Sequence, residues 1–148
     1  MEWQITMNDT RAKDAYRRKV GLLTSEDIQS IRKKYDISQM DLCRILGWGD
    51  KTITRYESHQ VQDRAHDEVL RRIGNDPEWF LELLGKAQKT LPDRACERYR
   101  TNATALCKRK NDEQEWQRTL MEAVRQSPRT REEILAFIRG KMPRRISG

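Results

Sequence analysis

The sequence predicts an all-α protein, and three observations support this fold class. Residues that favour helices are abundant, and charged residues alone make up 36% of the chain. Apolar residues do not alternate with polar ones over any stretch, so strands are not expected. Several segments instead repeat apolar residues every three to four positions behind a capping residue. The 148 residues allow one modest domain with appendages.

The first expected elements are a basic lead-in and a capped amphipathic helix. Residues 1–20 are expected to form a basic N-terminal arm, helical or otherwise ordered, which Gly21 ends. In "TSEDIQSIRKKYD", Thr24 is expected to cap a helix with Asp27 as its partner three residues later. The inner face of this helix is expected to hold Ile28, Ile31 and Tyr35.

Two short helices separated by a glycine turn come next. Ser38 is expected to cap "SQMDLCRILG", and Gly47 to end it in the left-handed conformation. The expected apolar stripe is Leu42, Ile45 and Leu46. Asp50 is expected to cap the following helix, residues 51–58. In that helix Ile53 and Tyr56 are expected to point inward and the remaining polar residues outward.

Two more helices complete the predicted domain, which spans residues 21–88. One is expected to begin at Asp63 and to stop before Gly74. Its expected buried residues are Ala65, Val69, Leu70 and Ile73. The other is expected to begin with Asp76 as cap and Pro77 in the first turn, and to end near Gly85. Its expected apolar residues are Trp79, Phe80, Leu83 and Leu84.

A helical extension is expected over residues 89–140, followed by a basic tail at 141–148. Helical spacing relates Ala95, Tyr99, Ala103 and Leu106, and again Trp116, Leu120 and Val124. Further along, Thr130 with Glu133 forms a capping-box pattern, and Gly140 is the expected stop. The apolar stripes of this extension must be buried somewhere, by folding back, by dimerisation or by binding a partner.

Charge and composition narrow the function classes. The net charge is +7, and residues 91–148 carry fourteen Lys/Arg against eight Asp/Glu. Such a surplus favours polyanions such as nucleic acid, although a solvated charged surface is an equally good reading of composition alone. Three distant cysteines and two histidines do not give the spacing of a disulfide framework or a metal site. No catalytic grouping, cofactor motif, signal peptide or membrane span is evident, so a non-enzymatic cytoplasmic protein is expected.

The glycine turn between two short helices predicts a helix-turn-helix, whose second helix enters the major groove of double-stranded DNA. Lys51 and Arg55 are four residues apart, and both can bind the acceptor edge of guanine. Thr52 is expected to join them at the bases. The expected phosphate contacts are Thr54, Ser38 and Arg44.

Simpler interpretations stay open for these residues. Arg55 could instead pair with Glu57 or Glu26. Trp48 is expected to pack in the turn rather than to stack on a base. The basic run at residues 32–34 fits phosphate contacts and a solvated helix end equally well.

The segment "SQMDLCRILGWGDKTITRYES" resembles the helix-turn-helix of the Xre/Cro family. Residues 21–90, with "GLLTSEDIQSIRKKY" and "VLRRIGNDPEWFLELL", resemble more closely the DNA-binding domain of MqsA-type and Panacea-associated antitoxins. The resemblance implies Lys51 and Arg55 as base readers and Gln39 as a phosphate contact. It does not extend to the zinc finger of MqsA-type proteins, because the paired cysteines are missing.

Two functional hypotheses follow. The first is a sequence-specific regulator, probably a repressor of antitoxin or mobile-element type, that binds an inverted repeat as a homodimer. The alternative is a protein-interaction antitoxin or adaptor whose C-terminal helices bind a toxin or another operon partner.

Overall fold

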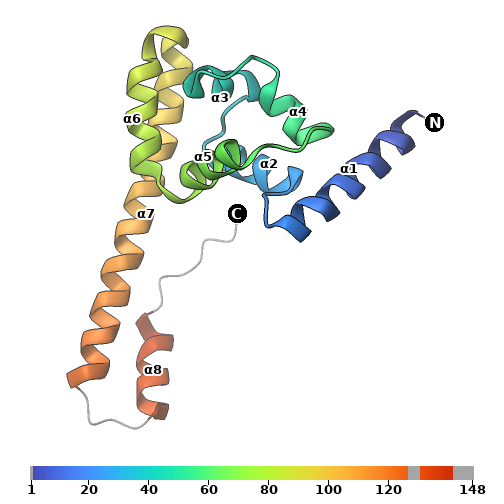
Figure 1. The fold of residues 1–148 in the computed structure, drawn as a ribbon. Helices are drawn as coiled ribbons and strands as arrows, with labels where there is room; N and C mark the ends of the chain where they lie inside the picture. Colours follow the sequence, from blue (N-terminus) through green and yellow to red (C-terminus); the bar gives the residue numbers. More distant parts are fainter. Residues whose placement is uncertain (1, 127–130, 142–148) are drawn as a thin grey trace. The chain divides into compact units, whose positions relative to one another are not determined.

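A computed structural model describes residues 2–126 and 131–141, with side chains for residues 7–126 and 132–140. These residues form helices and no strand, which confirms the predicted all-α class. The chain divides into two compact units, residues 1–107 and 108–148, and α7 belongs to both. The helices are α1 (Glu2–Val20), α2 (Ser25–Lys34), α3 (Gln39–Leu46), α4 (Thr52–Ser58), α5 (Arg64–Asn75), α6 (Pro77–Ala87), the 3₁₀ turn η1 (Gln88–Thr90), α7 (Asp93–Gln126) and α8 (Arg131–Lys141) (Figure 1).

The first unit has one apolar core, to which α2–α7 contribute. Helix α2 packs on α4 and α5, and α3 packs on α4 and α6. Most of the expected inward residues are confirmed as buried: Ile28, Ile31, Tyr35, Leu42, Ile45, Ile53, Tyr56, Leu70, Ile73, Phe80 and Leu84. Val69 is only partly buried, and the expectation for Ala65 is wrong because this residue is exposed.

Side-chain caps fix the starts of four helices as the sequence predicts. Thr24 and Asp27 form the expected capping box at α2. The side chains of Ser38, Asp63 and Asp76 each accept a backbone N–H of α3, α5 or α6. Each bond satisfies a donor that has no partner within its helix.

The expected cap of α4 is wrong. The residue in the N-cap position is Lys51, which makes no side-chain capping bond, and Asp50 lies exposed in the preceding turn. The first N–H of this helix, at Thr52, instead bonds the carbonyl oxygen of Gly49 at 2.9 Å. A tight backbone turn therefore replaces the expected side-chain cap.

Three glycines that were expected to stop helices lie inside them. Helix α5 runs past Gly74, where the missing Cβ admits Ile31; an added Cβ would lie 3.0 Å from the Ile31 Cγ1. Helix α6 continues through Gly85 to the buried Ala87, and α8 includes Gly140. A helical glycine costs only about 1 kcal/mol, so packing of the next residues can outweigh it.

The first part of α7 closes the core of the first unit. Tyr99 and Ala103 are fully buried, and Ala95 and Leu106 are partly buried, as expected. The Asn102 side chain donates to the carbonyl oxygen of Tyr35 at 2.9 Å. The two helical patterns expected between residues 89 and 126 prove to be one helix of 34 residues.

The second unit holds the rest of α7 and α8. Trp116 and Leu120 are partly buried there, whereas Val124 is 41% exposed. Met121 and Leu135 are also exposed, at 59% and 42%. The capping residue Thr130 and the tail at 142–148 lie outside the described residues.

Candidate nucleic-acid interface

The connection between α3 and α4 reverses the chain within residues 47–51. Gly47 adopts a left-handed conformation, with φ 68°, and ends α3 as predicted. The Trp48 N–H then bonds the carbonyl oxygen of Cys43 at 2.9 Å. Hydrogen bonds of the backbone therefore hold the turn in one conformation, which fixes the direction in which α4 leaves it.

The inner face of α4 is seated in the core. Ile53 is fully buried and Tyr56 is 5% exposed, as expected. The Ile53 N–H points at the Cys43 sulfur, 3.5 Å away. Burial raises the pKa of the Cys43 thiol, so this thiol stays protonated at neutral pH and serves as a packing group.

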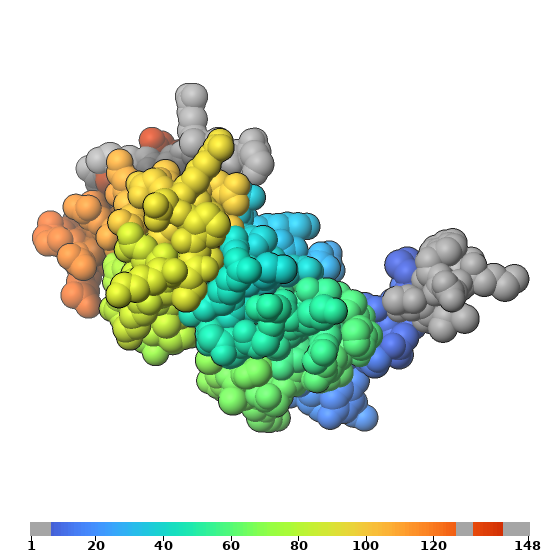
Figure 2. Space-filling model, turned by 90° about the horizontal axis from the view of Figure 1, so that it is seen from above, coloured from blue at the N-terminus to red at the C-terminus, as the bar shows by residue number. Residues whose placement is uncertain are grey.

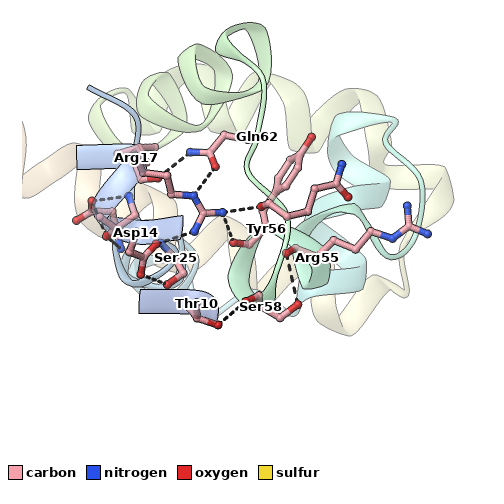
Figure 3. A network of polar contacts seen from close by, with 12 residues as sticks. Thr10, Asp14, Arg17, Ser25, Arg55, Tyr56, Ser58 and Gln62 are labelled. Atoms are coloured by element: carbon pink, nitrogen blue, oxygen red, sulfur yellow. Dashed lines mark hydrogen bonds and ion pairs between the residues drawn. The ribbon is translucent and has the colours of Figure 1, made fainter. Parts of the chain in front are cut away.

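The outer face of α4 carries two cations. Lys51, Thr54 and Arg55 are exposed, and Thr52 is half-buried. Neither the Lys51 nor the Arg55 side chain forms a hydrogen bond or ion pair with another described residue. In Figure 3 the Arg55 side chain extends away from the neighbouring polar cluster into solvent. Both positive charges are therefore available to a ligand.

A buried carboxylate joins the three helices α2, α3 and α4. Glu57 is 8% exposed and accepts two bonds from Arg32, at 2.8 and 3.1 Å. It also accepts a bond from the Gln39 amide at 2.6 Å. The expected alternative, an Arg55–Glu57 pair, is wrong because Arg32 occupies that carboxylate. Likewise, Arg32 braces the fold and leaves the open question of phosphate binding to Lys33 and Lys34.

The predicted phosphate contacts are brought together at the start of α3. The Thr54 hydroxyl donates to the Gln39 side-chain oxygen at 2.9 Å, so these residues are positioned by each other. Ser38 uses its oxygen as the α3 cap and keeps its hydroxyl proton for a further acceptor. Arg44 lies on the same helix with a 3.5 Å contact to Asp41 and a side chain 39% exposed.

Trp48 packs in the turn, as expected. Its ring stacks on His66 with centroids 3.9 Å apart, and meets Tyr56 edge-on at 6.4 Å. Burial raises the pKa of the Tyr56 hydroxyl, which keeps its proton for the 2.6 Å hydrogen bond with His66 Nδ1. The three rings thereby tie the turn and α4 to α5.

Helix α1 caps the carboxyl end of α4, which the sequence did not reveal. Arg17 donates to the carbonyl oxygens of Tyr56 and Gln60, at 2.7 and 2.6 Å (Figure 3). The Thr10 hydroxyl donates to the carbonyl oxygen of Ser58 at 2.6 Å. These carbonyls are the ones that a helix leaves unpaired at its end, where a positive charge is also favourable.

Arg17 is only 1% exposed and belongs to a fully bonded polar group, here called the Arg17 cluster: Asp14, Arg17, Ser25, Gln62 and Asp67. Besides the α4 carbonyls, Arg17 donates to Asp14 at 2.7 Å and to Gln62 at 3.0 Å. Gln62 donates in turn to Asp67 at 2.9 Å. Among the described residues, no buried side-chain nitrogen or oxygen lacks a hydrogen-bond partner.

Both carboxylates of the Arg17 cluster are held in the ionised form. Burial opposes ionisation of Asp14, but hydrogen bonds from Ser25 and the ion pair with Arg17 outweigh it and lower its pKa. Burial likewise opposes ionisation of Asp67, but bonds from Gln62, from the Leu23 backbone and from Arg71 lower its pKa too. The cluster is therefore a charged, satisfied network inside the fold.

The exposed face of the first unit carries α3 and α4 side by side, with the segment that includes the start of α7 next to α3 (Figure 2). Figure 1 shows the beginning of α1 beyond the other end of α4. Polar and basic residues of four helices thus surround the turn. The chemistry of this face, donors and cations without a metal or nucleophile, suits recognition of an anionic surface.

Metal and membrane sites were also sought. Within residues 2–126 and 131–141, no group of three His, Cys, Asp or Glu side chains is arranged to hold a metal ion. In the same part of the chain, no helix has both the length and the apolar character needed to cross a bilayer.

Comparisons of the chain with protein-family models, with curated proteins and with solved structures gave no significant match.

Proposed function

We propose that the protein is a sequence-specific DNA-binding regulator in which α3 and α4 form a helix-turn-helix. In this proposal α4 lies in the major groove, with Lys51, Arg55 and Thr52 at the base edges. The observation that carries it is the two-sided character of α4: Ile53 and Tyr56 are buried, while both cations are exposed and unpaired. A helix built only for stability would gain from pairing those charges.

The surroundings of α4 support the same role. Gln39, Thr54, Ser38 and Arg44 cluster at the start of α3, where phosphates would flank a helix in the groove. The Glu57–Arg32 pair fixes α3 relative to α4, so these donors are preorganised. The exposed Asp50 lowers the positive potential beside Lys51, and replacing it with asparagine should therefore strengthen binding.

The experiment begins with selection of DNA duplexes from a random pool by the full-length protein. Binding of Arg55→Ala is then measured by fluorescence anisotropy on the selected duplex and on single-base variants. We expect a loss of ~1–3 kcal/mol that is confined to one base position. Arg118→Ala, an exposed arginine on the distal part of α7, is the control with equal charge loss.

Two results would contradict this reading. If no sequence is enriched, the protein is not a sequence-specific binder. If Arg55→Ala weakens all duplexes equally, Arg55 contacts phosphate and base reading is lost from the proposal. As a repressor it would bind as a homodimer to half-sites about one DNA turn apart, ~34 Å.

A second candidate function has its own observation. Met121, Val124 and Leu135 are large, exposed apolar residues in the second unit. Such a surface suits a protein partner, as in an antitoxin that neutralises a toxin. Affinity capture with full-length protein and a Met121→Glu, Val124→Glu variant tests it: loss of a partner bound by the parent protein supports it, and unchanged binding contradicts it.

A further inference from the structure

The start of α7 lies against the start of α3, although 58 residues separate the contacting side chains. The Tyr99 hydroxyl donates to the Asp41 carboxylate at 2.6 Å, and the Tyr99 ring is fully buried. Burial and this carboxylate raise the pKa of the Tyr99 hydroxyl, so the proton in the bond is retained. Two residues of α7, Tyr99 and Asn102, thereby anchor it to the loop and first turn that carry Ser38 and Gln39.

Arg98 is placed at this junction and points to solvent. Its guanidinium lies 3.3 Å from the Tyr99 hydroxyl and 5.1 Å from the centre of the Tyr99 ring. Its side chain is 54% exposed. Since the same hydroxyl bonds Asp41 in the first turn of α3, Arg98 stands beside the cluster of donors formed by Ser38, Gln39 and Thr54.

The only ion pair of Arg98 within the described residues is weak. Its Nε lies 3.6 Å from an Asp36 oxygen, and the Asp36 side chain is 72% exposed. Surface pairs of this kind contribute ~0–1 kcal/mol. A phosphate, with a higher charge density and room for two parallel hydrogen bonds, would replace this carboxylate at little cost.

We propose that Arg98 is a DNA phosphate contact, so that α7 forms part of the DNA-binding surface and is more than a dimerisation or partner-binding extension. This inference rests on the proposed function and adds an element to it. Arg98 would bind the backbone next to the phosphate held by the start of α3. The contact would be independent of base sequence, because phosphates carry no sequence information.

The test measures binding of full-length Arg98→Ala to the selected duplex and to an unrelated duplex at several salt concentrations. We expect affinity to fall roughly 2- to 5-fold on both duplexes, the range for one exposed charge pair. The slope of log affinity against log salt should also decrease by about one. Arg100→Ala is the matched control, because Arg100 is exposed on the opposite side of α7 and carries the same charge.

A second variant gives a change of opposite sign. Asp36 has a positive φ of 53°, which asparagine also tolerates, so Asp36→Asn removes the charge without straining the backbone. It should strengthen binding to both duplexes, because Arg98 loses its competing carboxylate. A purely structural Arg98–Asp36 pair would instead make both substitutions lower stability and leave DNA affinity unchanged.

The outcomes separate this inference from the proposed function. Equal affinities and salt slopes for Arg98→Ala and Arg100→Ala overturn the role of Arg98, while a base-specific effect of Arg55→Ala would still support the regulator. If the parent protein binds no duplex above background, both proposals are overturned. A loss for Arg98→Ala that Asp36→Asn reverses in sign supports the assignment.

Discussion

Replacing Arg17 with methionine should be among the most damaging single substitutions in the chain. The change removes four hydrogen bonds, to Asp14, Gln62 and the carbonyls of Tyr56 and Gln60, at 2.6–3.0 Å. Water cannot easily replace them, because Arg17 is 1% exposed. Methionine is chosen because it keeps an unbranched apolar stem of similar reach.

The magnitude follows from what the substitution leaves behind. Breaking a buried ion pair by removing one partner costs ~3–5 kcal/mol, because the other charge stays buried without compensation. Here that charge is Asp14, and two helix-end carbonyls lose donors as well. The desolvation cost of the guanidinium is recovered, so the four bonds do not simply add. We therefore expect a loss of about 3–5 kcal/mol, a large part of the stability of a typical domain.

The assay is urea unfolding followed by circular dichroism, with Arg18→Met as control. Arg18 is the exposed neighbour on the same helix, and its replacement should change the unfolding free energy by less than ~0.5 kcal/mol. Adding Asp14→Asn to Arg17→Met should cost less than the sum of the single changes, because the pair is coupled. A loss below ~1 kcal/mol for Arg17→Met would refute the role assigned to the Arg17 cluster.

Two further predictions concern acid stability and helical glycines. Asp14 and Asp67 have pKa values below the ordinary 3.8, so their contribution is present above that pH and is lost as the pH falls through their lowered pKa values. Urea midpoints should therefore drop below about pH 4, and less so for the Asp67→Asn variant; equal drops would contradict this. Gly85→Ala should stabilise α6 by ~0.5–1 kcal/mol in thermal unfolding, since nothing lies within 4 Å of the added Cβ. Gly74→Ala should gain less because its Cβ would crowd Ile31, and equal gains would show that Ile31 moves freely.

Local pattern was a good guide wherever neighbours within one helical turn decide the outcome. Helix starts followed from single capping residues such as Thr24 and Asp63, and inner faces followed from the spacing of apolar residues such as Ile28 and Ile31. The left-handed Gly47 was predictable for the same reason, because the conformational preference of glycine is intrinsic. The candidate site on α4 followed in outline from the pattern of residues 51–58.

Predictions failed where tertiary packing outweighs a local preference. Glycine disfavours a helix only weakly, so Gly74 and Gly85 could not mark ends that the core had already extended. Asp50 is a good capping residue, yet the turn closed with backbone bonds and left it in solvent. In both cases the competing energies are near 1 kcal/mol, and only the surrounding contacts decide between them.

The sequence by itself determined the helices, their inner faces and the exposed cations Lys51 and Arg55, because these depend on residues three or four positions apart. Only the tertiary structure decided which charges are used internally. It placed Arg17 at the end of α4, paired Glu57 with Arg32, and set Arg98 beside α3. Hydrogen-bond partners that are 25 to 58 residues apart leave no periodic trace along the chain, since their pairing arises from burial in the folded protein.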